Sequence, residues 1–311
     1  MNGVTDVLVI GAGPAGAAAA TVAARAGASV CLVDRALFPR PKVCGDAISN
    51  SAFQIAEELA GERATAVPRA KVRGAVAIFP DGSRVRRSYG DAPGCIVERT
   101  DFDDLFRCSA ELAGARVLQG VQVRQLVREG KRFVGAEGPG FRWRAGVTIV
   151  ADGTASLAWD AVGLEPPKAA ALGISATAYY AGLGDGQDPG HSEHFFEKSL
   201  PTGYAWIFPA VHGRANVGVY LRVDRYRRGK TRIAELLNEF TARHRSRFAG
   251  ATRDGSVRTW SLPLATFAET PGAPGLLVCG DAARLIDPLT GEGIWHALHS
   301  GRLAGRFAAE A

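Results

Sequence analysis

Several features are scarce in this chain of 311 residues, and each scarcity excludes a class of protein. The five cysteines are odd in number and none has the Cys-x-x-Cys spacing of a zinc ribbon or a redox pair, so we expect reduced thiols, as in a cytoplasmic protein. No apolar run approaches the roughly 18 residues that a transmembrane helix needs, and no signal-peptide pattern precedes Asp6. We therefore expect a soluble or membrane-peripheral protein.

Lysine is also scarce, so the net charge of +6 comes mostly from arginine. Basic residues are dense over 222–232 and 243–247. They indicate either attraction to anionic lipid or to a phosphorylated substrate, or simply a solvated helix and its flanks. Nothing in the composition indicates a nucleic-acid module. His296 and His299 lie three residues apart without an evident third ligand, and we predict no metal site.

The N-terminus carries a pattern typical of dinucleotide binding. Residues 6–10 read as a buried strand, followed by Gly11-Ala12-Gly13-Pro14-Ala15-Gly16, an alanine-rich helix over 17–25, and a second strand ending at Asp34-Arg35. Gly11 would permit the tight turn, Gly13 would let the backbone approach a pyrophosphate, and Gly16 would let the helix pack on the strand. Asp34 would accept hydrogen bonds from the adenosine ribose. The alternative is a glycine turn in an ordinary α/β domain.

A second segment at the far end of the chain has the chemistry to grip the same dinucleotide. A strand over 276–279 leads into Gly280-Asp281, a loop with Pro288, and Gly291-Glu292-Gly293-Ile294 at the start of a helix. An acidic residue at a strand end can bind a ribityl hydroxyl, and glycines at a helix start let backbone N–H groups approach an anion or a carbonyl. This pairing resembles flavoproteins of glutathione-reductase type. The full stretch 276–301 resembles the geranylgeranyl reductase family of FAD-dependent oxidoreductases, which is related to flavoprotein hydroxylases and halogenases.

The resemblance and the order of predicted elements together give an α/β fold. We expect a Rossmann-like FAD-binding domain of glutathione-reductase type, interleaved with an antiparallel-sheet substrate domain. The FAD-binding domain would comprise residues 1–70, 95–165 and 265–311, and the substrate domain 71–94 and 166–264. Asp81-Gly82 predicts a hairpin turn, and either Thr100 or Asp101 is expected to be the N-cap of a helix. The substrate domain is expected to contain a helix at 231–244 and strands at 171–180, 192–196, 204–209 and 216–223.

Several further cofactor contacts are implied by the resemblance. The Pro-Arg-Pro-Lys-Val-Cys-Gly segment at 39–45 would place Cys44, Gly45 and Ala47 against the flavin, with Cys44 near the reacting face. Lys42 would then lower the pKa of the Cys44 thiol; the alternative is that Cys44 is a small packing residue. The remaining contacts would be made by Arg99, at the pyrophosphate, and by Val123, whose backbone would meet the adenine.

Two motifs bear on the reaction. Asp152-Gly153 with Ser156 resembles the Asp-Gly motif of flavoprotein hydroxylases, where Asp152 would contact FAD or merely cap its turn, but Trp159 stands where those enzymes have arginine. The Tyr-x-Trp-x-Phe-Pro signature at 204–209 would place Tyr204 and Trp206 on the substrate cavity, unless these aromatics are ordinary core. Tyrosine at the first position argues against a halogenase. The family usually continues to a Gly-x-Gly, but here Gly218 is followed by Val219 and Tyr220, and the missing second glycine predicts a reshaped or shortened cavity.

We therefore expect an FAD-dependent oxidoreductase that reduces carbon–carbon double bonds of a small apolar substrate, an isoprenoid being the first choice. NAD(P)H or another transient donor would supply the electrons, and contact with a membrane surface stays open. The first alternative is an FAD-dependent monooxygenase acting on an aromatic or polyketide-like substrate. The second is a non-catalytic flavin-binding protein. In the family, a helical region that would help roof the cavity continues past the position of Ala311.

Overall fold

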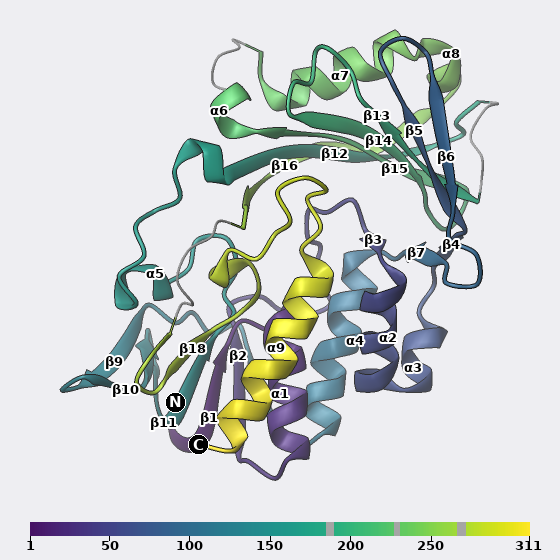
Figure 1. The fold of residues 1–311 in the computed structure, drawn as a ribbon. Coiled ribbons are helices and arrows are strands. Elements are labelled where there is room, and N and C mark those ends of the chain that lie inside the picture. Colours follow the sequence, from purple (N-terminus) through teal and green to yellow (C-terminus); the bar gives the residue numbers. More distant parts are fainter. Residues whose placement is uncertain (185–189, 227–230, 266–271) are drawn as a thin grey trace.

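The computed structural model describes residues 1–184, 190–226, 231–265 and 272–311, and two large sheets dominate it (Figure 1). The first has five parallel strands at its centre, in the order β8 (Arg116–Gln119), β2 (Val30–Asp34), β1 (Asn2–Ile10), β11 (Phe141–Val150) and β18 (Leu276–Val278). Val7 to Ile10 pair with both β2 and β11 and are almost completely buried, which explains their continuous apolar run. The N-terminal motif therefore begins at the centre of this sheet.

One face of the first sheet is covered by helices from both ends of the chain (Figure 1). They are α1 (Pro14–Arg25), α2 (Asn50–Ala60), α3 (Glu62–Ala66), α4 (Arg99–Leu112) and α9 (Ile294–Ala309). Glycines of α9 fit against α1, because a Cβ added at Gly301 would lie 2.0 Å from the Ala15 carbonyl oxygen and one at Gly305 would lie 2.3 Å from that of Ala19. Only glycine permits this backbone approach, so residues almost 300 positions apart along the chain share one core.

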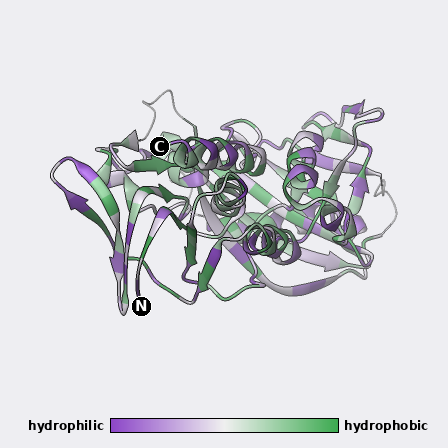
Figure 2. Ribbon diagram, turned by 90° about the horizontal axis from the view of Figure 1, so that it is seen from below, coloured by the Kyte–Doolittle hydropathy of each residue, from purple (hydrophilic) through white to green (hydrophobic). Residues whose placement is uncertain are grey.

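Three strands of the first sheet pair antiparallel with their neighbours. The hairpin of β9 (Gln125–Glu129) and β10 (Arg132–Gly138) extends β11, and β17 (Gly272–Ala273) pairs with β18. Figure 2 shows hydrophilic stretches on this projecting hairpin and hydrophobic stretches in the interior strands. The short helix α5 (Ala158–Ala161) follows the Asp152-Gly153 turn.

The second sheet has seven strands. Their order is β16 (Thr252–Pro263), β12 (Leu172–Ala181), β15 (Arg214–Arg222), β14 (Gly203–Pro209), β13 (His191–Phe195), β5 (Gly74–Ile78) and β6 (Arg84–Ser88). The four strands expected within 171–223 are present and pair antiparallel, as predicted. Its outer face is covered by α6 (Val223–Tyr226), α7 (Ile233–Arg243) and α8 (Arg245–Phe248), and the 3₁₀ turn η1 (Ala169–Ala171) precedes β12.

Some expectations about local structure are wrong. The hairpin β5–β6 turns at Gly82 as predicted, but β5 joins β13 in parallel, so the second sheet is mixed. Helix α4 begins at Arg99 with Glu98 as its N-cap, so neither Thr100 nor Asp101 caps it. The sequence pattern also did not predict helix α2 or strand β16.

A third sheet of three short strands joins the two large ones. It contains β3 (Ala47–Ile48), β7 (Gly94–Ile96) and β4 (Ala70–Val72). The α/β fold with a Rossmann-like half and a second, mainly antiparallel sheet is confirmed, while the predicted domain boundaries remain a proposal. Within the described ranges, no helix is long and apolar enough to span a bilayer.

Candidate functional site

A cavity of about 1260 Å³ opens between the two large sheets. Its walls come from the Gly-x-Gly turn, the 40–50 loop, the start of α4, the concave side of the second sheet and the loop before α9. Most residues predicted from sequence line it, namely Gly11, Gly13, Ala15, Asp34, Arg35, Cys44, Gly45, Ala47, Arg99, Val123, Asp152, Tyr204, Trp206, Asp281, Gly291, Gly293 and Ile294. Segments far apart in the sequence therefore converge on one space.

Gly16, Gly280 and Pro288 do not line the cavity, and each has a structural position behind it. A Cβ on Gly16 would lie 1.8 Å from the Gly11 carbonyl oxygen, so Gly16 lets α1 pack against the strand end. Gly280 begins the 3₁₀ turn η2 (Gly280–Ala283), with a φ of 65°, and its N–H donates to Ser300 Oγ at 3.0 Å. Pro288 offers its carbonyl oxygen to the Tyr220 hydroxyl at 3.2 Å.

The Gly-x-Gly turn is held by the conformation of Gly11 and by hydrogen bonds to Asp34. Gly11 has a φ of 100°, which only glycine adopts without strain. Asp34 Oδ2 accepts from the Ala12 N–H at 2.7 Å and Oδ1 accepts from the Ala36 N–H at 2.7 Å. Asp34 therefore stabilises the turn itself, and the remaining lone pairs of its carboxylate can accept hydrogen bonds from ribose hydroxyls.

A cluster of charge lies at the start of α4. Arg99 is buried and forms a bidentate ion pair with Asp103, with Nε–Oδ1 at 2.7 Å and Nη2–Oδ2 at 2.9 Å, and Arg40 Nη1 lies 3.1 Å from the same carboxylate. Burial opposes the charge on Arg99, but Asp103 and Cys44 outweigh it and raise the pKa of Arg99. Two arginines share one carboxylate here, so the cluster keeps net positive charge facing the cavity.

The expectation that Lys42 ionises Cys44 is wrong. Burial raises the pKa of the Cys44 thiol, although Arg99 opposes the shift. Lys42 is itself affected, because burial lowers its pKa to about 8 and Arg99 adds to the effect. Its ammonium lies 3.5 Å from the centroid of the Trp260 ring, a cation–π contact. Cys44 is thus a neutral thiol at neutral pH.

Aromatic side chains of the second sheet wall the cavity opposite the Gly-x-Gly turn. Tyr204, Trp206 and Phe208 of β14 share one face, as the period of a strand requires, and Tyr220 of β15 joins them. A Cβ on Gly218 would lie 2.1 Å from the Trp206 ring, so this glycine lets the indole lie flat on the sheet. Trp206 is also 95% buried among Phe208, Tyr220 and Ile286. This tryptophan therefore lines the cavity and belongs to the hydrophobic core at the same time.

The aromatic wall is tied to the loop before α9. The Tyr204 hydroxyl donates to the Thr290 carbonyl at 2.5 Å, and Tyr220 donates to Pro288. Burial raises the pKa of Tyr204 and that of Tyr220, the latter to about 12. Both phenols are therefore neutral. Tyr220 fills space next to Gly173 and narrows the cavity at the position where the family pattern has a glycine.

Sequence reasoning missed Asn216 of β15, a buried residue directly behind the cavity wall. Its side chain makes four hydrogen bonds: Oδ1 accepts from Thr177 Oγ1 at 2.7 Å and Trp206 Nε1 at 2.9 Å, while Nδ2 donates to the Cys44 carbonyl at 2.9 Å and Asp46 Oδ2 at 2.8 Å. Asn216 thus fastens the 40–50 loop to the aromatic wall. Asp46, also missed, is a buried carboxyl group that lines the cavity.

Asp152 has the capping role that was one of its two predicted roles, while its contact with FAD stays a prediction. Oδ2 accepts from the Leu157 N–H at 2.8 Å and so caps the turn before α5, while Oδ1 is buried and without a hydrogen-bond partner in the described structure. Trp159, at the position where hydroxylases have arginine, donates from Nε1 to the Ala282 carbonyl at 2.8 Å and lies under Arg284 at 4.5 Å. It therefore joins α5 to η2.

Other sequence features lie outside this site. Arg243 pairs with Glu197, and Arg247 pairs with the buried Glu193 at 2.8 Å, so the charge of the basic stretch 243–247 is partly neutralised. Of the other basic stretch, 222–232, residues 227–230 lie outside the described residues. His299 stacks on Trp295, with ring centroids 4.9 Å apart. No group of three metal-ligating side chains occurs among the described residues.

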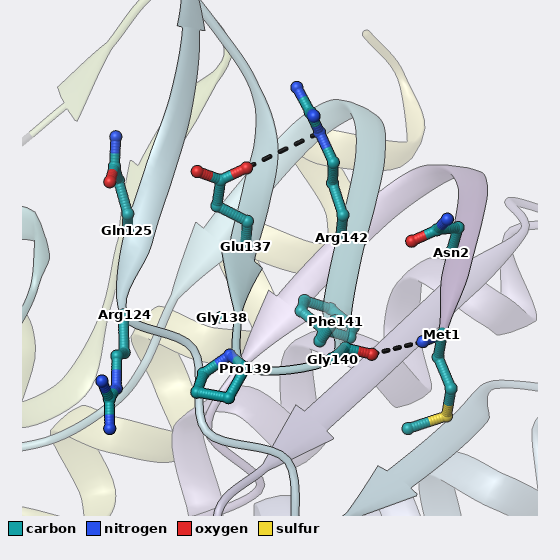
Figure 3. Close-up of a pocket in the computed structure, with 10 residues that line it drawn as sticks. All are labelled: Met1, Asn2, Arg124, Gln125, Glu137, Gly138, Pro139, Gly140, Phe141 and Arg142. Carbon is teal, nitrogen blue, oxygen red and sulfur yellow. Dashed lines mark hydrogen bonds and ion pairs between the residues drawn. The ribbon is translucent and has the colours of Figure 1, made fainter.

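A separate hollow of about 520 Å³ lies where the β9–β10 hairpin and β11 meet the start of β1 (Figure 3). Glu137 and Arg142 face each other across its strands at 3.6 Å, and the Met1 amino group donates to the Gly140 carbonyl. None of the predicted site residues lines this hollow.

Comparison with known proteins agrees with this geometry. A family model described as an FAD binding domain matches residues 4–306. A digeranylgeranylglycerophospholipid reductase of Methanopyrus kandleri is 35% identical over 312 residues, which cover 98% of this chain and 80% of the relative. The menaquinone reductase of Mycobacterium tuberculosis is 32% identical over 318 residues, which cover 97% of this chain and 76% of the relative.

Solved structures extend the likeness. A geranylgeranyl bacteriochlorophyll reductase-like protein from Thermoplasma acidophilum matches with a TM-score of 0.89 at 26% identity, covering 100% of this chain and 79% of that one. The chain belongs to the geranylgeranyl reductase family of FAD-binding proteins. A flavin-dependent brominase matches with a TM-score of 0.81 at 22% identity, covering 99% of this chain and 79% of that one, which shows the shared fold alone.

This member of the geranylgeranyl reductase family is an FAD-dependent oxidoreductase, and its cavity fits the cofactor. The N-terminus of α1 has no side-chain cap, so its N–H groups are available to a pyrophosphate. Space for the approach exists, because a Cβ on Gly13 would meet only Arg40, at 3.8 Å. Two buried acceptors of the cavity wall, Asp152 Oδ1 and Glu292 Oε1, lack a partner among the described residues and suit hydroxyl or N–H donors.

Proposed function

We propose that this oxidoreductase reduces carbon–carbon double bonds of an apolar, isoprenoid-like substrate. The observation that carries the proposal is the aromatic wall of Tyr204, Trp206, Phe208 and Tyr220, which faces the same cavity as the Gly-x-Gly turn. The names of the relatives, which describe reductases of an isoprenoid lipid and of menaquinone, support the same substrate class. Burial of an isoprenoid chain would contribute about 0.8 kcal/mol per methylene group.

The chain's own residues divide the work. When bound, FAD supplies the hydride chemistry. The Gly-x-Gly turn, Asp34, Arg99 and Asp281 would hold the cofactor, and Cys44, Gly45 and Ala47 would contact its flavin end. The aromatic wall orients the alkene and excludes water, which is the protein's contribution to such a reaction. NAD(P)H or another donor would supply electrons transiently, and a membrane surface that holds the substrate remains a prediction.

The test uses the purified protein loaded with FAD, photoreduced without oxygen and mixed with a geranylgeranyl compound. We expect flavin reoxidation together with a product that has gained two hydrogens. Substrate-dependent oxygen uptake with a hydroxylated product would instead support a monooxygenase. If FAD stays bound and neither reaction occurs, the protein is a flavin-binding protein without this activity.

A matched pair of tryptophan variants tests the role of the wall. Trp206→Phe should slow reoxidation by the alkene because it removes the hydrogen bond to Asn216 and reshapes the cavity. Trp143→Phe should not, because Trp143 is equally buried but lies in the core of the first sheet, outside the cavity. Equal rates in both variants and in the wild type would reject a substrate-facing wall.

A further inference from the structure

Asp46 is a buried acid with an unusual setting. Its side chain is 98% buried at the cavity, and its backbone has a φ of 63°, a left-handed conformation that only a few non-glycine residues adopt. Such conformations persist where the surrounding structure holds them and are frequent at functional sites. Here the holding contacts are the Tyr179 hydroxyl and the Asn216 amide, which both donate to Asp46 Oδ2.

The orientation of Asn216 is fixed by its other partners. Trp206 Nε1 can only donate a hydrogen bond, so the Asn216 atom that faces it must be the oxygen. The amide nitrogen must then face the Cys44 carbonyl and Asp46 Oδ2. Both donors thus converge on Oδ2, while none of the described residues donates to Oδ1. This arrangement leaves Oδ1 as the oxygen that carries a proton when Asp46 is neutral.

We propose that Asp46 is the proton donor of the cavity, delivering the Oδ1 proton to the substrate carbon that does not receive the hydride. The proposal rests on the proposed alkene reduction. The electron pair of the double bond forms the new C–H bond with this proton, the O–H electron pair stays on the Asp46 carboxylate, and the hydride from reduced FAD completes the other carbon. Water from the mouth of the cavity then returns a proton to the carboxylate.

Electrostatics agree with this role. Burial raises the pKa of Asp46 to about 7, and Glu98 adds to the shift; the hydrogen bonds from Tyr179 and Asn216 and the charge of Arg99 oppose it. An acid with a pKa near the working pH is suited to donate a proton and recover it. Cys44 lies beside Asp46 but its thiol has a raised pKa. Lys42, with a pKa of about 8, His194, with a pKa of about 4, and Asp281, whose pKa is raised by burial, also line the cavity.

The first test replaces Asp46 by its neutral isostere. Asp46→Asn keeps an oxygen for Tyr179 and Asn216 but has no proton to give. We expect bound FAD to be retained and alkene reduction at about pH 6 to fall by roughly 10²-fold, the usual contribution of general-acid catalysis. Independently of turnover, difference infrared spectra of the wild type without FAD should show a carboxylic-acid band that disappears as pH rises through about 7 and is absent from the variant.

The second test identifies the group behind the pH profile. If Asp46 must be protonated, activity is present below its pKa and falls as pH rises through it. Tyr179→Phe removes a hydrogen bond that lowers this pKa, so the fall should move to higher pH. A fall caused by Lys42 would not move. Asp224→Asn, which removes a partly exposed carboxylate paired with Arg222 outside the cavity, is the control and should leave the profile unchanged.

The outcomes separate this proposal from the proposed function. If the wild type reduces the alkene and Asp46→Asn does so at the same rate with the same profile, Asp46 is not the donor although the function stands. A carboxyl band already lost at about pH 5 would overturn the proposal too. If the wild type reduces no alkene, both fail. Should Asp46→Asn not hold FAD, the Tyr179→Phe profile decides, and an unshifted fall rejects Asp46.

Discussion

At the scale of single residues, burial in the cavity favours the neutral form of several titratable side chains. The Cys44 thiol, the Asp46 carboxyl group and the two phenols of the wall all have raised pKa values because of burial, and His194 has a lowered one for the same reason. A site that contains reduced flavin and an apolar alkene benefits from such surroundings, since neutral groups bring little water with them. Charge is concentrated instead where the pyrophosphate is expected, at Arg99.

Cys44→Ser should keep FAD bound and slow alkene reduction without abolishing it. The loop position depends on the Cys44 carbonyl, which Asn216 holds, so the side chain can change while the backbone stays. Flavin content and the rate of flavin reoxidation measure the effect. Cys108→Ser, on α4 and away from the cavity, should have no effect. Complete loss of turnover with intact FAD would show that the thiol is essential, and an unchanged rate would place it away from the reaction.

His194 should make the protein sensitive to acid. Burial lowers the pKa of His194 to about 4, whereas the unfolded chain has an ordinary value of 6.5. The stabilisation is therefore present above pH 6.5 and is lost as pH falls towards 4. By linkage, the loss at about pH 5 is about 2 kcal/mol. His194→Gln should lose that much less stability than the wild type between pH 7.5 and 5, measured by denaturant unfolding, whereas the exposed His212→Asn should behave as wild type. Equal acid sensitivity of His194→Gln and wild type would contradict this.

At the scale of elements, the contact between α1 and α9 holds the first sheet's helical layer together and positions both ends of the cofactor site. Helix α1 begins directly after the Gly-x-Gly turn, and α9 begins directly after Gly291-Glu292-Gly293. A small displacement of either helix would therefore change the distance between the two segments that are expected to bind FAD.

Gly301→Ala should destabilise the protein. Alanine in a helix is intrinsically better than glycine by about 1 kcal/mol, but the added Cβ would lie 2.0 Å from the rigid Ala15 carbonyl oxygen. We expect overpacking to prevail, with a net cost of about 1–3 kcal/mol and weaker FAD binding, measured by denaturant unfolding and FAD titration. Gly272→Ala is the control, because its Cβ would meet only the Leu276 carbonyl oxygen at an ordinary 3.5 Å. A stabilised Gly301→Ala would show that α9 moves freely.

At the scale of elements, some features of the fold and the site could be predicted from the sequence and others could not. The strand–turn–helix at Gly11, the hairpin at Gly82 and the aromatic face of β14 were predictable because each depends on neighbours within one or two elements. Asn216 and Asp46 were not, because their partners are 170 residues apart and a lone polar residue in a strand carries no periodic signal. Helix α2 was missed although its N-cap, Ser49, accepts from the Ala52 N–H in a standard way.

At the scale of the whole molecule, residues of both sheets line the cavity, and removal of FAD from it should lower the stability of both. FAD at 100 times its dissociation constant stabilises a protein by about 2.7 kcal/mol. We expect noncovalent FAD that acid precipitation releases. A pellet that stays yellow would indicate a covalent link.

The two acidic residues that are expected to bind FAD should contribute unequally to its affinity. Asp281→Ala should cost more FAD affinity than Asp34→Ala, because Asp281 lies deeper and next to Lys42 and Arg99, while Asp34 also holds the turn through Ala12 and Ala36. FAD titration and the FAD-dependent rise in melting temperature measure both. The exposed Asp160→Ala on α5 should match wild type. If neither Asp281→Ala nor Asp34→Ala alters FAD affinity, the cofactor has been placed wrongly.

The glycine contact between α1 and α9 also determines when this chain can fold. During synthesis, α1 leaves the ribosome early, but the surface that buries Ala15 and Ala19 is made almost 300 residues later. The second sheet, whose strands lie closer together in sequence, can assemble first. The alanine-rich helix after the Gly-x-Gly turn must then stay unpacked until α9 has been synthesised, and contacts of this sequence separation form slowly. Nascent chains of this oxidoreductase should therefore remain dependent on chaperones, and unable to take up FAD, until α9 has been released.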